Sequence, residues 1–106
     1  MLFCVHITLR PVDSHELPEL LDRLVEEWEM LVDLTANGCV RACGKIARER
    51  GAIAIFDCTS RTELTQILER LPLARYSSSM EVISLIPLDQ ALAIARRSRA
   101  MAHATH

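Results

Sequence analysis

The sequence predicts an α+β fold in which two helices cover one face of a four-stranded antiparallel sheet. Half of the 106 residues are apolar and a quarter are charged, a composition typical of one globular domain. Four short stretches have the alternating or fully apolar pattern of strands, and two longer ones have apolar residues at helical spacing. Their order is strand, helix, strand, strand, helix, strand. With short connections and right-handed crossovers, this order folds as a ferredoxin-like βαββαβ sandwich.

The first strand is predicted over residues 2–9, because its apolar residues alternate. One face carries Phe3, Val5, Ile7 and Leu9, and the other carries Leu2, Cys4, His6 and Thr8. The segment "RPVDSHELPEL" follows, where Asp13 or Ser14 is expected to cap a helix. That helix runs from about Leu17 to Asn37 and stops at the Asn-Gly pair.

The middle strands are "CVRACGKIA" and "AIAIFDC", joined as a hairpin by the polar segment "RERG". Ser60 is expected to cap the second helix, which Pro72 closes. The last strand is predicted within "SSSMEVISLIPL". These elements make one domain over residues 1–88, followed by an alanine-rich helix and tail over residues 89–106.

A second subunit is predicted from the strands themselves. "AIAIF" and "VISLI" are apolar on both faces, whereas a solvated face would be polar. We therefore expect two sheets to pack face to face in a homodimer. The helix at 89–106 is too short for independent stability, so we expect it to pack on a neighbouring subunit. The alternative, a basic helix on a membrane surface, has only a weak apolar side to support it.

Composition excludes several classes of function. The net charge of −2 and the aromatic content of 4% argue against nucleic acid as a partner. No apolar run has the length of a membrane span and the start does not resemble a signal peptide, so the expected location is the cytoplasm and no membrane partner is expected. The four cysteines include no C-x-x-C pair, which predicts reduced, packed thiols and no metal site.

Several segments resemble the muconolactone isomerase family. They are "MLFCV" at the start, "PVD" at 11–13, Glu27, Gly38, "IFD" at 55–57 and "LPLARY" at 71–76. The resemblance spans roughly residues 1–86. It implies the ferredoxin-like dimeric barrel, with dimers that can assemble further into a ring, up to a decamer. It also implies an intramolecular shift of a double bond in an unsaturated lactone or a related small ring, by proton abstraction and return, without metal or organic cofactor.

Glu27 is the candidate general base. It lies near the edge of the apolar stripe of the first predicted helix, where apolar neighbours raise the pKa of a carboxyl. A raised pKa suits proton transfer from carbon. The alternative is a rim glutamate whose stem covers the core while its head stays in water.

His6 is the second catalytic candidate, because an imidazole could shuttle a proton or donate to a lactone carbonyl. The alternative is a buried, neutral histidine. Cys4 lies beside it at a position where the family usually has histidine, and a packed thiol is favoured over a nucleophile there. Both residues are expected to face the same side of the first strand.

Arg41 is the candidate anchor for a substrate carboxylate, and it has a counterpart in the family. It is predicted to share a strand face with Lys45, and the alternative is that both charges protect an exposed strand edge. Tyr76 is the remaining substrate-binding candidate, with a packed ring and a hydroxyl that finds one partner.

The rival function is a non-catalytic, oligomeric module that binds a small apolar ligand, with an eroded site. Departures from the family favour it: Val40 and Gly44 replace tryptophans, Ala52 lies near a family asparagine, and "PLDQ" replaces a His-Pro pair. A cavity at Glu27 would argue against this rival, and a filled core there would support it. An oxygenase or cyclase of the same fold, acting on polycyclic aromatics, is a third alternative that rests on fold analogy alone.

Overall fold

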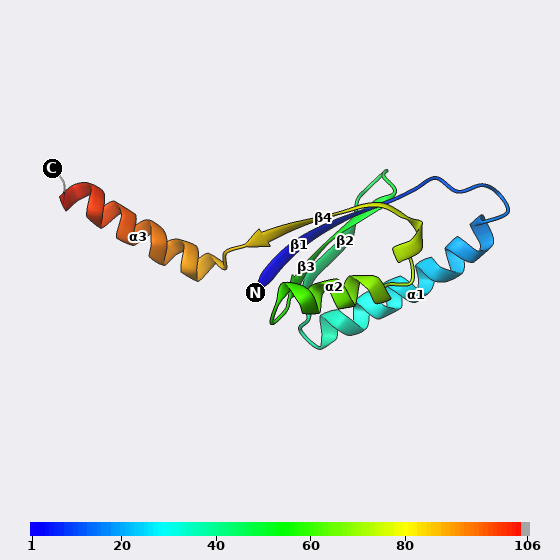
Figure 1. The fold of residues 1–106 in the computed structure, drawn as a ribbon, viewed down its shortest axis with the longest axis horizontal. Coiled ribbons are helices and arrows are strands. Elements are labelled where there is room, and N and C mark those ends of the chain that lie inside the picture. The colour runs from blue at the N-terminus through cyan, green and yellow to red at the C-terminus, as the bar shows by residue number, and fades with distance from the viewer. Residues whose placement is uncertain (105–106) are drawn as a thin grey trace.

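The computed structural model describes residues 1–104, and its elements follow the predicted order (Figure 1). The ferredoxin-like α+β prediction is confirmed. The predicted tail at residues 105–106 lies outside the described residues. The elements are β1 (Leu2–Leu9), α1 (Leu17–Ala36), β2 (Val40–Lys45), β3 (Gly51–Asp57), α2 (Arg61–Arg70), the 3₁₀ helix η1 (Ala74–Tyr76), β4 (Ser77–Leu85) and α3 (Leu88–Ala104).

The sheet has the strand order β2-β3-β1-β4, and each neighbouring pair is antiparallel. Helices α1 and α2 lie on one face of it (Figure 1). The predicted apolar face of β1 supplies Phe3, Val5 and Ile7 to the core beneath these helices. The core residues that meet them from the other elements are Leu31, Val40, Ala54, Phe56, Leu64, Leu68 and Leu71. Burial of these side chains positions α1 over the sheet.

The other face of the sheet is open in the single chain. Ile53 and Ile83 lie on it and are 42% and 55% exposed, while Cys4 and His6 between them are half-buried. Exposed isoleucines on a sheet face are what the predicted second subunit would cover. The dimeric barrel itself stays a prediction.

The helix ends follow local chemistry. The prediction that Asp13 or Ser14 caps the first helix is wrong, because the N-cap residue of α1 is Glu16 and no side chain caps it. The Asp13 carboxylate instead accepts from the backbone N–H groups of His15 and Glu16 at 2.9 and 3.0 Å, so it closes a turn just before α1. The helix ends at Ala36, and Gly38 follows with φ of +86°. Ser60 caps α2 as predicted.

The C-terminal helix extends away from the domain (Figure 1). The described chain measures 68 × 26 × 23 Å, and its radius of gyration is 18.0 Å. A compact domain of this length has a radius of gyration of about 13 Å. None of the residues of α3 is buried. No helix within residues 1–104 has the length and apolar character needed to cross a membrane.

Candidate active site

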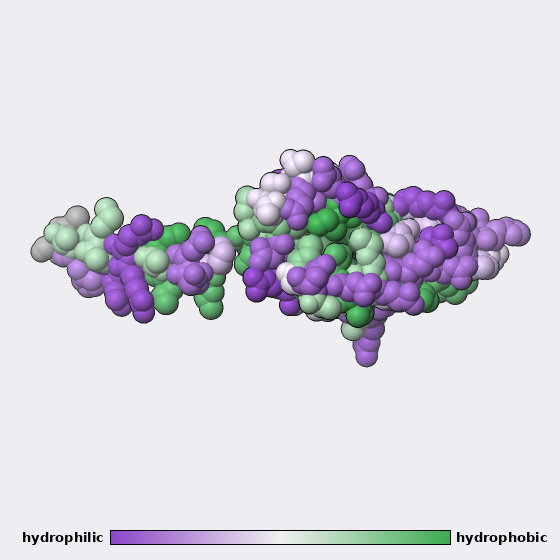
Figure 2. Space-filling view, turned by 90° about the horizontal axis from the view of Figure 1, so that it is seen from below, coloured by the Kyte–Doolittle hydropathy of each residue, from purple (hydrophilic) through white to green (hydrophobic). Residues whose placement is uncertain are grey.

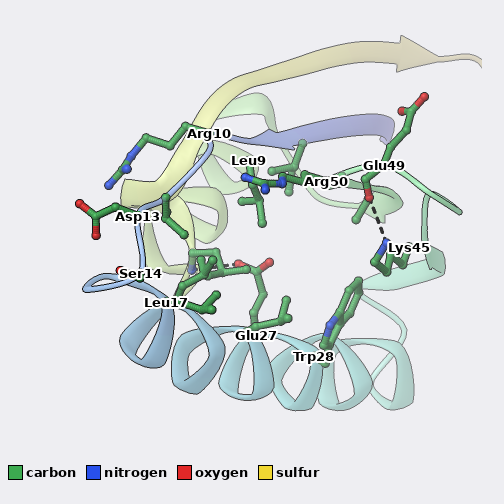
Figure 3. Close-up of a pocket in the computed structure, with 17 residues that line it drawn as sticks. Leu9, Arg10, Asp13, Ser14, Leu17, Glu27, Trp28, Lys45, Glu49 and Arg50 are labelled. Carbon is green, nitrogen blue, oxygen red and sulfur yellow. Dashed lines mark hydrogen bonds between the residues drawn. The ribbon is translucent and has the colours of Figure 1, made fainter.

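A cavity of about 350 Å³ lies between α1 and the helix-covered face of the sheet (Figure 3). Apolar side chains form most of its wall. The lining residues are Ile7, Leu9, Arg10, Val12, Asp13, Ser14, Leu17, Leu20, Leu24, Glu27, Trp28, Lys45, Glu49, Arg50, Gly51, Ala52 and Leu73. Its volume falls in the range of small-molecule sites.

Glu27 contributes a carboxylate to this cavity from the helix side (Figure 3). The residue lies one helical turn from both Leu24 and Leu31, and it is only 5% exposed. Burial raises the pKa of Glu27, and a backbone hydrogen bond from Leu73 offsets part of that rise. The rim-glutamate alternative, with its head in water, does not describe this buried side chain.

One oxygen of this carboxylate is fixed and the other is free of partners. The Leu73 N–H donates to Glu27 Oε1 at 3.1 Å, because Pro72 ends α2 and turns the chain back over α1. Oε2 has no hydrogen-bond partner among residues 1–104. The carboxylate is therefore held in one orientation with an oxygen available to accept a proton.

Three cationic side chains also line the cavity. Lys45 Nζ donates to the carbonyls of Ile46 and Glu49 at 3.1 and 3.0 Å. Arg10 is engaged in an ion pair with Glu16. Arg50, by contrast, has no ion pair within the described chain, and Figure 3 shows it on the sheet side of the cavity, across from the helix that carries Glu27.

Cys4 and His6 do not line this cavity. In the sheet register, Cys4 lies beside Ile55 and Ile83, and His6 lies beside Ile53 and Glu81, all on the open face. The sheet thus separates both residues from Glu27 within one chain. They are neighbours of each other, as predicted, but the structure does not bring them to the carboxylate.

Arg41 also lies away from the cavity. Its guanidinium donates to Asp57 Oδ2 at 2.5 and 3.1 Å and lowers the pKa of that carboxyl. The prediction that Arg41 and Lys45 share a face of β2 is wrong. A register shift between Val40 and Ala42 adds a residue and resets the alternation, so Lys45 lines the cavity while Arg41 does not.

Tyr76 is a structural neighbour of the site. Its ring is buried at 2% exposure, and its hydroxyl accepts from Arg75 Nη2 at 2.7 Å, in agreement with the predicted packing. The guanidiniums of Arg10 and Arg75 lie over the ring, 5.2 and 4.8 Å from its centroid. The side chain does not line the cavity, but it anchors η1, which directly follows Leu73.

Sequence reasoning missed Arg50 and the backbone N–H of Leu73. Arg50 belongs to the "RERG" segment, whose polar residues predict only a solvent-exposed turn. Its place beside Gly51, at the start of a strand that faces α1, is the one signal that could have found it. The Leu73 contact joins residues 46 positions apart, and no local pattern encodes it.

None of the four cysteines is in a disulfide in the described part of the chain. Burial raises the pKa of Cys58 to about 11, so this thiol stays neutral. Cys43, in contrast, is exposed at the sheet edge. Within residues 1–104, no group of three or more His, Cys, Asp or Glu side chains could hold a metal ion.

Comparison with known proteins places these features in context. The model of the muconolactone delta-isomerase family matches residues 1–91. A crystal structure of muconolactone isomerase superposes with a TM-score of 0.72 at 31% identity, covering 82% of this chain and 90% of that one.

A second solved structure shares the fold. It is the 5-chloro-2-hydroxyhydroquinone dehydrochlorinase from Burkholderia phenoliruptrix AC1100, in complex with 2,5-dihydroxybenzoquinone. Its TM-score is 0.67 at 19% identity, covering 85% of this chain and 98% of that one. Among curated protein sequences, none matches the chain.

Proposed function

This chain belongs to the muconolactone delta-isomerase family, and from that premise we propose that it is a cofactor-independent isomerase. Its substrate would be an unsaturated lactone or a related small ring in which a double bond moves. The observation that carries the proposal is the buried Glu27 carboxylate, which lines a cavity of about 350 Å³. A filled core at this position would have favoured the non-catalytic binding module instead.

The proposed reaction begins with proton removal by Glu27. Its ionised carboxylate takes a proton from a ring carbon made acidic by the conjugated lactone carbonyl, which leaves a dienolate. The same carboxyl then returns the proton to a different carbon, and the double bond moves with no net change of atoms or electrons. The Leu73 N–H bond to Oε1 keeps the base oriented through both transfers.

The cations of the cavity support an anionic intermediate or a substrate carboxylate. Lys45 is fixed by two backbone carbonyls and acts as a point charge. The Arg50 guanidinium, in contrast, can donate two parallel hydrogen bonds to the two oxygens of a carboxylate. Both assignments are new relative to the sequence prediction, which gave the carboxylate anchor to Arg41. The roles predicted for His6, Cys4 and Tyr76 stay proposals, with His6 and Cys4 placed across the sheet from Glu27.

The direct test is turnover of muconolactone, followed by the ultraviolet absorbance of the conjugated product. Wild-type protein should convert the substrate, and Glu27→Gln should lower kcat by about 10²- to 10⁴-fold, because the amide cannot accept the proton. Glu26→Gln is the matched control, since Glu26 lies on the same helix, is exposed and should keep full activity.

Two outcomes would contradict the proposal at different levels. No turnover by wild-type protein, together with binding of the substrate, would favour the non-catalytic module. Turnover that survives in Glu27→Gln would leave an isomerase with a different base. A pH profile adds a check, because kcat/KM should fall as the pH falls through the raised pKa of Glu27.

A further inference from the structure

The cavity that contains Glu27 has two chemically different ends. In Figure 3, Lys45 and Trp28 lie to one side of Glu27, and Ser14 and Leu17 lie to the other. Leu17 and Glu27 are ten residues apart on α1, so the cavity runs about 15 Å along this helix. The proposed reaction uses Glu27 and the cations beside it, and the end near Leu17 has no role in it.

Five aliphatic side chains form a wall at this end of the cavity: Leu9, Val12, Leu17, Leu20 and Leu24. The three that come from α1 recur at spacings of three and four residues, so they share the face of the helix that carries Glu27. Leu9 ends β1, and Val12 belongs to the segment that follows it. This aliphatic wall therefore depends on the packing of α1 against the end of β1.

The charged side chains at the same end are already engaged. Arg10 is paired with Glu16 at 2.8 Å, and the Asp13 carboxylate accepts two backbone N–H groups of its own turn. Both Arg10 and Asp13 extend outward from the cavity (Figure 3), and the outer surface around the start of α1 is mainly hydrophilic (Figure 2). A ligand group that reaches this end from Glu27 therefore meets hydrocarbon.

The aliphatic wall borders open space. Leu17 is 43% exposed, and Leu20 and Leu24 are half-buried, whereas Leu64 in the core is fully buried. Apolar side chains around an unfilled cavity lower the stability of a protein, because they lack the contacts that close packing provides. An apolar occupant restores these contacts.

The cavity is larger than a simple lactone acid. Benzene, with six non-hydrogen atoms, binds in an engineered apolar cavity of about 150 Å³. At that density the cavity of about 350 Å³ holds about 14 non-hydrogen atoms, about four more than muconolactone contains. The cations and Glu27 account for the carboxylate and the ring, so the additional space lies along the aliphatic wall.

We propose that the aliphatic wall is a subsite for an alkyl substituent on the ring of the substrate. The inference rests on the proposed isomerase function and names its substrate class. The carboxylate of the substrate lies at Lys45 and Arg50, and its ring lies beside Glu27. A chain of about four carbons then extends from the ring toward Leu17. With opposite polarity at its two ends, the cavity binds such a lactone in one orientation.

Two unreactive probes test the subsite in the full chain. Furan-2-acetate has a planar five-membered ring and a carboxylate, and 5-butylfuran-2-acetate adds four apolar carbons across the ring. Isothermal titration calorimetry should give the butyl probe a Kd about 10²-fold lower, because each buried methylene lowers Kd by about fourfold. The butyl probe should also bind with a more negative change in heat capacity, which marks the burial of apolar surface.

Substitutions at Leu17 and Leu20 show where the butyl chain binds. Leu17→Glu should reduce the preference for the butyl probe by about tenfold or more, because the chain would then contact a carboxylate. Leu17→Met is the matched control and should keep the preference, since methionine is apolar and of similar volume. Leu20→Gln and Leu20→Met repeat the comparison at the next turn of α1. Circular dichroism checks that each variant is folded.

Several results would overturn the subsite. They are equal Kd values of the two probes in wild-type protein, binding of neither probe, and a preference that survives in both polar variants. A loss of preference that is equally large in the methionine variants would also contradict it. Because neither probe is isomerised, a butyl preference without turnover would keep the subsite and remove the proposed reaction. Turnover of muconolactone without a butyl preference would do the opposite.

Discussion

Glu27 shows how a single residue can serve chemistry at a cost in stability. Its carboxylate is buried with one hydrogen bond, so ionisation in the folded protein is less favourable than in the unfolded chain. A residue placed only for stability would not be a carboxylate at this position. The raised pKa of Glu27 is consistent with a base that must remove a proton from a weakly acidic carbon.

Glu27→Gln should stabilise the protein at neutral pH. The folded-state pKa of Glu27 is raised, so its contribution to stability is best below the unfolded-state pKa and is lost as the pH rises through the folded-state value. The amide keeps an oxygen for the Leu73 N–H and has no charge to desolvate. Thermal unfolding should therefore show a higher Tm for the variant at pH 8 and a smaller difference at pH 4. A difference that is constant with pH would contradict this assignment.

Arg50 and Arg41 make opposite predictions for substrate binding. Arg50→Gln should raise KM by about 10- to 100-fold with a smaller change in kcat, because a charge-assisted hydrogen bond contributes about 1.5–3 kcal/mol. Arg41→Gln should leave KM unchanged, since Arg41 pairs with Asp57 away from the cavity. Steady-state kinetics on muconolactone separates the two. A KM effect confined to Arg41→Gln would move the carboxylate anchor to the open face of the sheet.

At the scale of elements, the hairpin of β2 and β3 decides which cations reach the cavity. Simple alternation along β2 places Arg41 and Lys45 on one face. The irregular register after Val40 moves Arg41 to the Asp57 side and leaves Lys45 beside Ala52 in the cavity wall. A local pattern predicts the strand but cannot reveal the added residue, because a bulge depends on the partner strand.

The segment after α2 is the second element that shapes the site. Pro72 ends the helix, and η1 returns the chain to β4 with Tyr76 held under Arg10 and Arg75. This packing positions the Leu73 N–H over α1, where it meets Glu27. The segment from Pro72 to Tyr76 thus fixes the orientation of the Glu27 carboxylate, the candidate base.

At the scale of the whole molecule, two apolar surfaces have no covering element within residues 1–104. One is the open face of the sheet, with exposed Ile53 and Ile83, and the other is the outer flank of α1, with exposed Leu21, Val25 and Val32. Two surfaces of this kind allow a chain to build dimers and then larger closed assemblies.

The open face should hold two subunits together through sheet packing. Ile83→Lys should lower the molar mass in solution, because a buried, unpaired ammonium at such a contact is strongly unfavourable. Thr62→Lys, at an exposed position of α2, is the control and should leave the assembly intact. Light scattering at matched concentration gives the answer. An unchanged mass in Ile83→Lys would show that this face is not an interface.

The sequence by itself determined the order of the elements, the core face of β1, the Ser60 cap of α2 and the ends of the helices. Each of these follows from local periodicity, capping chemistry or glycine and proline, which act over a few residues. Only the tertiary structure decided that His6 and Arg41 lie away from Glu27, that Arg50 and Leu73 join it, and that α3 extends away from the domain. These outcomes depend on strand register and on contacts between distant residues, and such contacts are set by packing rather than by local pattern.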